Sequence, residues 1–300
     1  MPSQTKSVAF FALAIFGLAT IANSATAEEL KARSLKYRDD LGQTYQAIMI
    51  KAADQAAQAG PRDHVVLIDT SASQSGEYRD QTFSVLDSFA ASLPETDRIR
   101  LFAVDISAKE LTSQFEAANS AGYAKARKAL DRRAPLGATN VKRALEAALN
   151  VVDSKRSTSV VFLGDGFSTS HLIQETEIET LISKLQTAKV PFNAFAVGRR
   201  NDLQLLGVLA HWTGGRVIQD DTSVKSSLLG RQLASSARAN VVYTTGLKAD
   251  GVVFPKAALP IRSDRETVYL SKGAIPSQIK LNTAAGEVVW TIPQAKENKE

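Results

Sequence analysis

The amino-acid sequence predicts an α/β protein, with a doubly wound, mostly parallel sheet and a small β-rich C-terminal appendage. Between residues 64 and 238, short apolar runs that suit buried strands alternate with amphipathic segments of helical length. Such alternation is typical of right-handed βαβ crossovers and of an open sheet that helices cover on both faces. After residue 240, short β-rich stretches separated by glycines and prolines indicate a small antiparallel unit.

The composition excludes several classes of function. The chain has 300 residues, is 44% hydrophobic and carries a net charge of +5, so it can bury an ordinary core. The basic excess is mild and shows no dense stripe of Lys and Arg with interleaved aromatics, so we expect no nucleic-acid partner. There is no cysteine, which excludes disulfides, thiolate metal sites and a cysteine nucleophile.

Residues 1–27 are predicted to be a secretory signal peptide. Lys6 supplies a positive start, Val8 to Ala22 is an uncharged apolar stretch, and Ala25-Thr26-Ala27 is a small-residue cleavage site. The alternative is an uncleaved anchor, but the stretch is shorter than the ~20 residues that a spanning helix needs. We therefore expect cleavage after Ala27 and a secreted or periplasmic chain without a membrane span.

The next segment, residues 28–61, is predicted to be a helical N-terminal extension. It is rich in Ala, Lys, Gln and Glu and contains no proline before Gly60-Pro61, which is where we expect the helix to end.

Residues 62–238 are predicted to form the main α/β domain. Val65 to Ile68 and Val160 to Leu163 are wholly apolar runs, which is typical of parallel strands buried on both faces. Further strands are expected at residues 99–106, 192–197 and 217–218. Helices are expected at residues 76–93, 120–133, 141–152, 178–185, 202–212 and 222–237.

Residues 239–295 are predicted to form the β-rich C-terminal segment, with strands at residues 241–243, 252–254, 267–270, 278–281 and 287–292. The charged tail, residues 296–300, is expected to be disordered.

Two carboxylates lie where an α/β sheet places its ligand site. Asp69 and Asp165 each follow an apolar strand, and ligands bind at the carboxyl ends of the strands in open sheets. After Asp69, the hydroxyls of Ser71 and Ser73 occupy alternate positions, which project the same way in an extended turn. Hard oxygen ligands with few charges favour Mg²⁺, with Mn²⁺ or Ca²⁺ as alternatives, over Zn²⁺. An open position on such a cation would bind an acidic side chain of a partner.

The segment from Asp69 to Ser73 resembles the Asp-x-Ser-x-Ser motif of the von Willebrand factor type A family, the metal-ion-dependent adhesion site. The family also has a threonine in a glycine-rich loop and an aspartate after a later strand, and Thr139 and Asp165 match these in order. The resemblance covers about residues 62–238. It implies that Ser71, Ser73 and Thr139 are direct or near-direct metal ligands, while Asp69 and Asp165 hold the metal directly or through water.

The resemblance also implies an adhesion or protein-binding module with no catalytic residues, whose partner is a protein presenting an Asp or Glu. Three positions depart from the family pattern, namely Gln74, Ala138 and Gly164. None of them removes a ligating oxygen, although Gln74 leaves the shape of the loop open.

Simpler interpretations exist for each part of the motif. Asp69 and Ser71 also fit a helix N-cap pair, and Asp165 fits a Gly-Asp-Gly turn. A P-loop and a Gly-x-Ser-x-Gly elbow are absent, and Ser71 stands where an aspartyl phosphatase needs its second Asp. A metal-dependent hydrolase with His171 as its base remains open as a function. So does a structural scaffold of an envelope assembly with a non-essential metal site. The sequence leaves the oligomeric state open.

Overall fold

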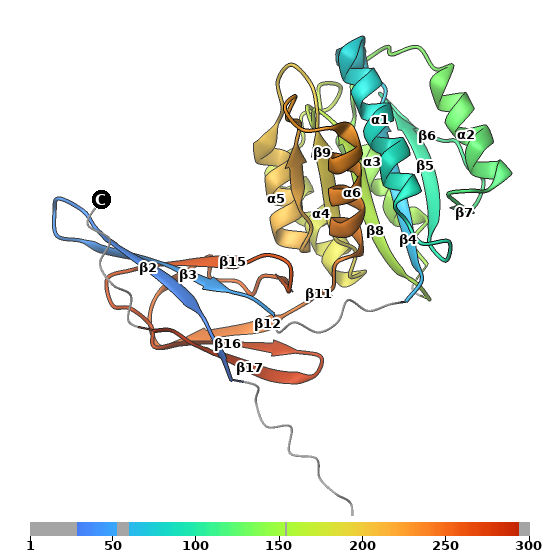
Figure 1. Ribbon diagram of the computed structural model, residues 1–300. Helices are drawn as coiled ribbons and strands as arrows, with labels where there is room; N and C mark the ends of the chain where they lie inside the picture. The colour runs from blue at the N-terminus through green and yellow to red at the C-terminus, as the bar shows by residue number, and fades with distance from the viewer. Residues whose placement is uncertain (1–28, 53–59, 154, 294–300) are drawn as a thin grey trace, which may run out of the picture.

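The computed structural model describes residues 29–52, 60–153 and 155–293, which form an α/β domain and a smaller β domain (Figure 1). The α/β domain is built on a seven-stranded sheet of order β10-β9-β8-β4-β5-β6, with β7 also paired to β5. Its strands are β4 (Arg62–Asp69), β5 (Arg98–Val104), β6 (Ala108–Glu110), β7 (Glu116–Ala117), β8 (Ser157–Gly164), β9 (Phe192–Ala196) and β10 (Val217–Gln219). All neighbours pair in parallel except β6 and β7, which run antiparallel to β5.

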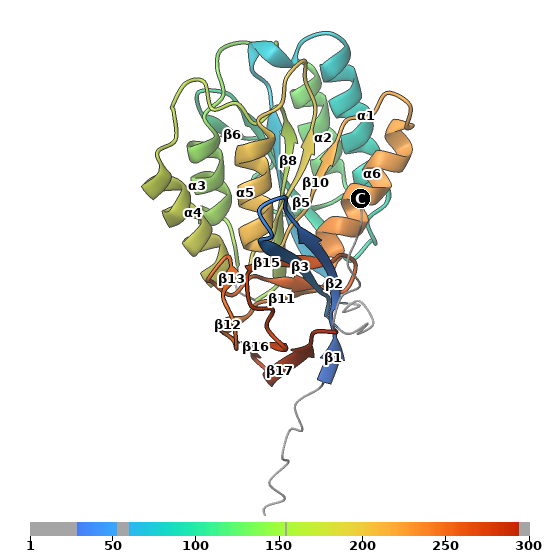
Figure 2. The same ribbon diagram turned by 90° about the vertical axis from the view of Figure 1, so that its left-hand side faces the viewer.

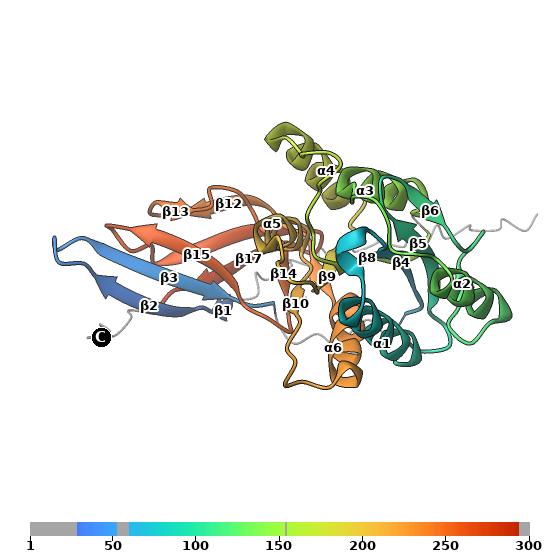
Figure 3. The same ribbon diagram turned by 90° about the horizontal axis from the view of Figure 1, so that it is seen from above.

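Helices cover both faces of this sheet, as Figure 3 shows from above. One face packs on α1 (Glu77–Ala91), α2 (Ala121–Asp131) and α6 (Ser226–Arg238), and the other on α3 (Val141–Asn150), α4 (Glu175–Thr187) and α5 (Leu203–Thr213). Along β4, Val66 and Ile68 join the first core while Val65 and Leu67 join the second. Every residue of β4 is buried, as an apolar central strand requires. The predicted doubly wound fold is therefore confirmed.

The β domain contains two four-stranded sheets and a two-stranded one. The first sheet has the order β1-β17-β16-β12, the second β13-β15-β3-β2, and β11 pairs with β14. The bounds are β1 (Glu29–Lys31), β2 (Arg33–Arg38), β3 (Thr44–Ile50), β11 (Val241–Val242), β12 (Thr245–Ala249), β13 (Val253–Phe254), β14 (Ile261–Arg262), β15 (Thr267–Lys272), β16 (Gln278–Thr283) and β17 (Gly286–Thr291). Ile48, Tyr269, Ile279, Leu281 and Trp290 form the centre of the core between the sheets.

The predicted helix over residues 28–61 is wrong, because the described part of this segment forms β1, β2 and β3. The inward side chains of β3 are Gln46, Ile48 and Ile50, which is the two-residue period of a strand. Gly42, with φ at +78°, closes the β2–β3 hairpin. The composition of this segment favours a helix, but the long-range pairing of β3 with β15 stabilises a strand instead.

The β-rich C-terminal segment is therefore only part of a domain. Strands from the beginning of the described chain lie beside strands from its end, as the blue and red arrows in Figures 1 and 2 show. The predicted signal peptide with its cleavage site (1–27) and the tail predicted to be disordered (296–300) lie outside the described residues. Among the residues that are described, no helix is long and apolar enough to cross a bilayer.

Arg262 joins the two domains. Its side chain is fully buried, and it donates from Nη1 to the carbonyl of Gly214 at 2.8 Å and from Nη2 to the carbonyl of Ser236 at 3.1 Å. Gly214 caps the end of α5, and Ser236 lies in the last turn of α6. Asp264 accepts from the other edge of the guanidinium at 2.7 Å. One ionic side chain thus ties strand β14 to two helix ends.

Candidate metal centre

The five predicted ligands come from three loops at the carboxyl edge of the sheet. Asp69 is the last residue of β4, and Ser71 and Ser73 lie in the turn that follows, where Ser71 precedes the short 3₁₀ helix η1 (Ala72–Gln74). Asp165 directly follows β8. Thr139 precedes Asn140, whose side chain caps α3 by accepting from the Arg143 amide. Because β4 and β8 are parallel neighbours, their ends bring these loops together.

Hydrogen bonds connect all five residues. The Thr139 hydroxyl lies 3.0 Å from both carboxylate oxygens of Asp69. Ser71 and Ser73 are 3.0 Å apart at their hydroxyl oxygens, and Ser73 donates to Asp165 at 2.6 Å. The amide of Ser71 donates to Asp69 at 2.9 Å, which links the two halves of the cluster. The N-cap and turn interpretations of the separate parts do not account for this convergence.

The cluster is buried except on one side. Asp69, Ser71, Thr139 and Asp165 are between 1% and 4% exposed, whereas Ser73 is exposed at the rim. Burial, and next the neighbouring Asp165 carboxylate, raise the pKa of Asp69 to about 7. The charged form of Asp69 is therefore disfavoured where it lies. A cation between the two carboxylates would remove that penalty.

Gly164 sets the position of Asp69. A Cβ atom at Gly164 would lie 2.4 Å from the Cβ of Asp69 and 3.0 Å from its Oδ2. Any side chain at position 164 would therefore collide with the Asp69 side chain unless β4 or β8 shifted. The departure from the family's threonine at this position has a steric reason that the sequence alone does not show.

Two further residues support the cluster, and their roles could not be predicted from the motif. Gln74 is buried and donates from Nε2 to the Val197 carbonyl at 3.1 Å and to Asp165 at 3.4 Å. Arg133, the last residue of the helix predicted at residues 120–133, lies beyond the end of α2, donates to the Thr70 hydroxyl at 3.0 Å and pairs with Asp105. Its guanidinium therefore anchors the loop next to Asp69.

The donor set fits a hard divalent cation. It contains only carboxylate and hydroxyl oxygens, which Mg²⁺ accepts and which Zn²⁺ sites rarely use alone. No cluster of three or more His, Asp or Glu that could hold a metal exists within the described residues, so any cation here would rely on hydroxyl ligands. In an octahedron with bonds of about 2.05 Å, neighbouring ligand oxygens lie about 2.9 Å apart. The hydrogen-bonded oxygens of this cluster already keep comparable separations of 2.6 to 3.0 Å.

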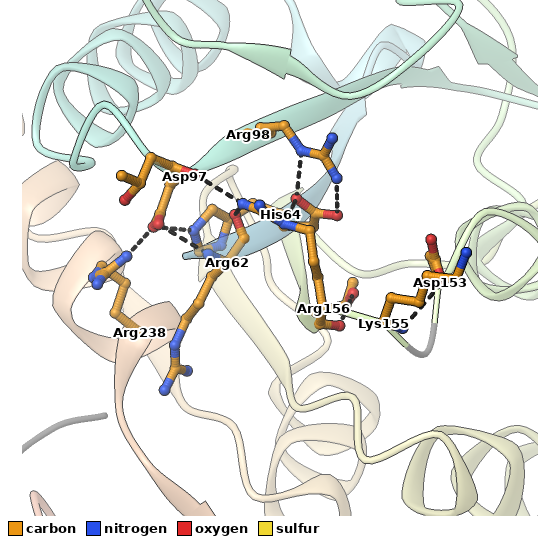
Figure 4. A network of polar contacts seen from close by, with 11 residues as sticks. Arg62, His64, Asp97, Arg98, Asp153, Lys155, Arg156 and Arg238 are labelled. Atoms are coloured by element: carbon orange, nitrogen blue, oxygen red, sulfur yellow. Dashed lines mark hydrogen bonds and ion pairs between the residues drawn. The ribbon is translucent and has the colours of Figure 1, made fainter. Parts of the chain in front are cut away.

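A Ser–His–Asp arrangement exists elsewhere, at the opposite end of β4. His64 contacts Ser159 at 2.9 Å through Nδ1 and Asp97 at 3.0 Å through Nε2, and Asp97 also pairs with Arg238 (Figure 4). Ser159, His64 and Asp97 are at most 1% exposed. No substrate can reach a serine at that depth, so the arrangement holds strand ends together. His171, the candidate base of a hydrolase, contacts Glu177 at 2.9 Å.

The comparisons with known proteins point to one family. The family model for the von Willebrand factor type A domain matches residues 63–218. No curated protein matches the sequence.

Three solved structures show the same fold. A von Willebrand factor type A protein from Catenulispora acidiphila has a TM-score of 0.59 and 14% identity over 89% of this chain and 72% of its own. The ArnB paralog VWA2 from Sulfolobus acidocaldarius has a TM-score of 0.51 and 16% identity over 88% and 75% of the two chains. The human COPII-coat protein Sec24c has a TM-score of 0.50 and 11% identity over 82% and 46%. At these identities the likeness shows the fold alone. The matched family model spans more than half of the sequence, and the chain therefore belongs to the von Willebrand factor type A domain family.

Proposed function

We propose that this protein is an exported binding module that captures an Asp or Glu side chain of a protein partner through one Mg²⁺ ion. Von Willebrand factor type A domains are in general protein-interaction modules, and the proposal adds the metal, its ligands and the chemistry of the partner. The observation that carries it is the convergence of Asp69, Ser71, Ser73, Thr139 and Asp165 at one sheet edge.

The ligand chemistry supports capture of an acid. When bound, the ion would supply a Lewis-acidic position that a carboxylate can occupy. Three of the five donors are neutral hydroxyls, so they leave much of the ion's charge uncompensated. Ser73 is the exposed member of the set, which marks the side from which a partner's side chain would enter. Mg²⁺ often completes its octahedron with an incoming oxygen ligand, and such capture needs no turnover.

The same arrangement argues for binding rather than catalysis. A hydrolase would need a base beside the ion, and the only contacts that the described residues give the candidate base, His171, are to Glu177 and not to any of the five candidate ligands. We therefore include the absence of an enzymatic role in the proposal. Hydrolysis of phosphate or ester substrates that depends on Mg²⁺ and on Asp69 would contradict it.

Metal binding can be tested with Mg²⁺ alone. Thr139→Val keeps the shape of the side chain and removes the hydroxyl, and we expect calorimetric titration of the mature chain to show Mg²⁺ affinity at least tenfold weaker. The matched control is Thr267→Val, a buried threonine of the β domain whose hydroxyl donates to the Pro260 carbonyl. It should bind Mg²⁺ like the native protein. Equal affinity in both variants would exclude Thr139 as a ligand.

Partner capture is tested separately. The mature chain, immobilised, is exposed to envelope extract with Mg²⁺ and with chelator, and Asp69→Ala is run beside it. We expect the partner to be retained only by the native chain with Mg²⁺. Retention that persists in chelator would refute metal-mediated capture. Amino-terminal sequencing of the exported protein tests export, and a start at Glu28 is expected.

A second candidate function rests on the outer face of the sheet β13-β15-β3-β2. Leu35, Leu270 and Phe254 lie in one row across this face through Ala47 and are 51%, 55% and 47% exposed. An apolar row of this kind favours the scaffold of an envelope assembly, in which the metal site is not essential. This alternative predicts full retention of the partner by Asp69→Ala and its loss with Leu270→Lys.

A further inference from the structure

A cleft lies between the two domains, at the end of the sheet opposite the metal centre. Its volume is about 460 Å³, within the usual range for small-molecule sites. Arg62 at the start of β4 and Lys189 after α4 line one side, and Tyr243, Val288 and Trp290 of the β domain line the other. The cleft therefore exists only because the β domain packs against the strand ends.

Arg62 contributes a buried charge whose side chain makes no ion pair within the described residues. Its side chain is 8% exposed, and the only side-chain hydrogen bond that the described residues give it runs from Nη1 to the Ala239 carbonyl at 3.1 Å. Neighbouring arginines have carboxylate partners, since Arg238 pairs with Asp97 and Arg262 with Asp264. Figure 4 shows the Arg62 side chain running away from Asp97.

The surroundings of Arg62 disfavour its charge. Burial, and next the proximity of Arg238, lower the pKa of the Arg62 guanidinium, and the nearby Asp97 carboxylate offsets only part of this effect. Taking a cation out of water without a partner is costly, and an anion hydrogen-bonded to it would offset much of that cost.

The rest of the cleft has the same sign of charge. Lys189 is exposed at its edge, and the described lining residues include no Asp or Glu. Lys189 has φ at +54°, a left-handed conformation that glycine or asparagine would adopt at lower cost. The apolar part of the lining includes Val241, Val242, Ile261, Val288 and Trp290.

We propose that this cleft binds a small organic anion, with a carboxylate or phosphate head at Arg62 and Lys189 and an apolar body against the β domain. The guanidinium offers a planar donor edge that suits either head group. The site is separate from the metal centre, because Arg62 and Asp69 begin and end β4, roughly 23 Å apart at about 3.3 Å per residue.

The test uses the mature chain in chelator, so that no anion can bind through a metal. Calorimetric titrations compare octanoate and octyl phosphate with octanamide, which has the same apolar body and no charge. We expect saturable binding of at least one anion, at least tenfold weaker in Arg62→Gln, and weak binding of octanamide that the substitution leaves unchanged. The matched control is Arg231→Gln, which removes an exposed arginine of α6 and should bind like the native chain.

The outcomes separate the alternatives. Preference for octyl phosphate assigns a phosphate head and preference for octanoate a carboxylate head, and either supports the site. Absence of saturable binding by both anions, or equal affinity in Arg62→Gln, overturns it. If Arg62→Gln does not fold, Lys189→Gln at the exposed edge replaces it, with an expected threefold to tenfold weakening. An unchanged affinity in that variant overturns the proposal equally.

Discussion

Alanine at position 164 should damage the metal centre through sterics alone. The added Cβ would lie 2.4 Å from the Cβ of Asp69, whereas carbon atoms normally approach to about 3.5–4.0 Å. The overlap exceeds 1 Å by this comparison, and it cannot be relieved by a side-chain rotation, because both atoms are Cβ atoms fixed by the backbone. One of two paired, fully buried strand ends must move.

Overpacking of this kind costs about 1–3 kcal/mol of unfolding free energy. For a domain of this size, that corresponds to a fall in the thermal midpoint of roughly 2–12 °C. The displaced Asp69 should also lose its alignment with Thr139, so the Mg²⁺ affinity of Gly164→Ala should fall at least tenfold.

The assay is thermal unfolding by circular dichroism in chelator, followed by Mg²⁺ titration. Gly207→Ala is the matched control, since nothing lies within 4 Å of a Cβ there and the residue is inside α5. Replacing a helical glycine should stabilise this variant by up to about 1 kcal/mol. If Gly164→Ala melts with the native protein and binds Mg²⁺ equally well, the steric account of Asp69 is wrong.

Two further predictions concern the His64–Asp97 pair and the buried Arg262. Burial lowers the pKa of His64 from 6.5. For Asp97 burial acts to raise the pKa, but hydrogen bonds from His64 and Arg238 lower it to about 2. Both groups thus bind fewer protons in the folded chain than in the unfolded one. Urea titrations should therefore show stability falling as pH drops below 6.5 and falling further between about 4 and 2; a flat profile would contradict this. Arg262→Ala should cost about 1–3 kcal/mol, because the buried carbonyl of Gly214 loses its hydrogen-bond donor and the exposed Asp264 loses its ion-pair partner. Limited proteolysis should then cut between the domains, and an unchanged pattern would refute the role of Arg262 as a joint.

The α/β domain could be predicted from the sequence because its signals are local. A run such as Val65 to Ile68 is apolar throughout only if helices cover both faces of the strand. The positions of Asp69 and Asp165 then follow, since parallel neighbours end at the same edge. What the motif could not show is the support around it, because Gln74 reaches Val197 and Arg133 reaches Thr70 across long sequence separations.

The N-terminal strands of the β domain could not be predicted for the opposite reason. Strand β3 pairs with β15, which lies more than two hundred residues later, and β2 pairs with β3. No local sequence pattern indicates which distant strand β3 pairs with. A local signal was nevertheless present. Tyr45, Ala47 and Met49 alternate with the buried Gln46, Ile48 and Ile50, and residues 39–42, Asp-Asp-Leu-Gly, have the composition of a tight turn. Averaging composition over residues 28–61 concealed that period.

The interdomain cleft could not be predicted from the sequence, because the residues on each of its walls have no pattern that indicates a binding site. Arg62 reads as a charged residue before a strand, and Val288 and Trp290 read as ordinary strand residues. Only the packing of β17 near the start of β4 turns them into opposite walls of one cleft. The β domain lies beyond one end of the α/β sheet, at the bottom of Figure 2, whereas the candidate ligands Asp69 and Asp165 lie at the carboxyl ends of β4 and β8. A protein partner that binds at Ser73, as proposed, would therefore approach the end of the sheet farthest from the cleft. The two proposed sites could then be filled at once, and chelation of Mg²⁺ should leave the affinity for a small anion unchanged.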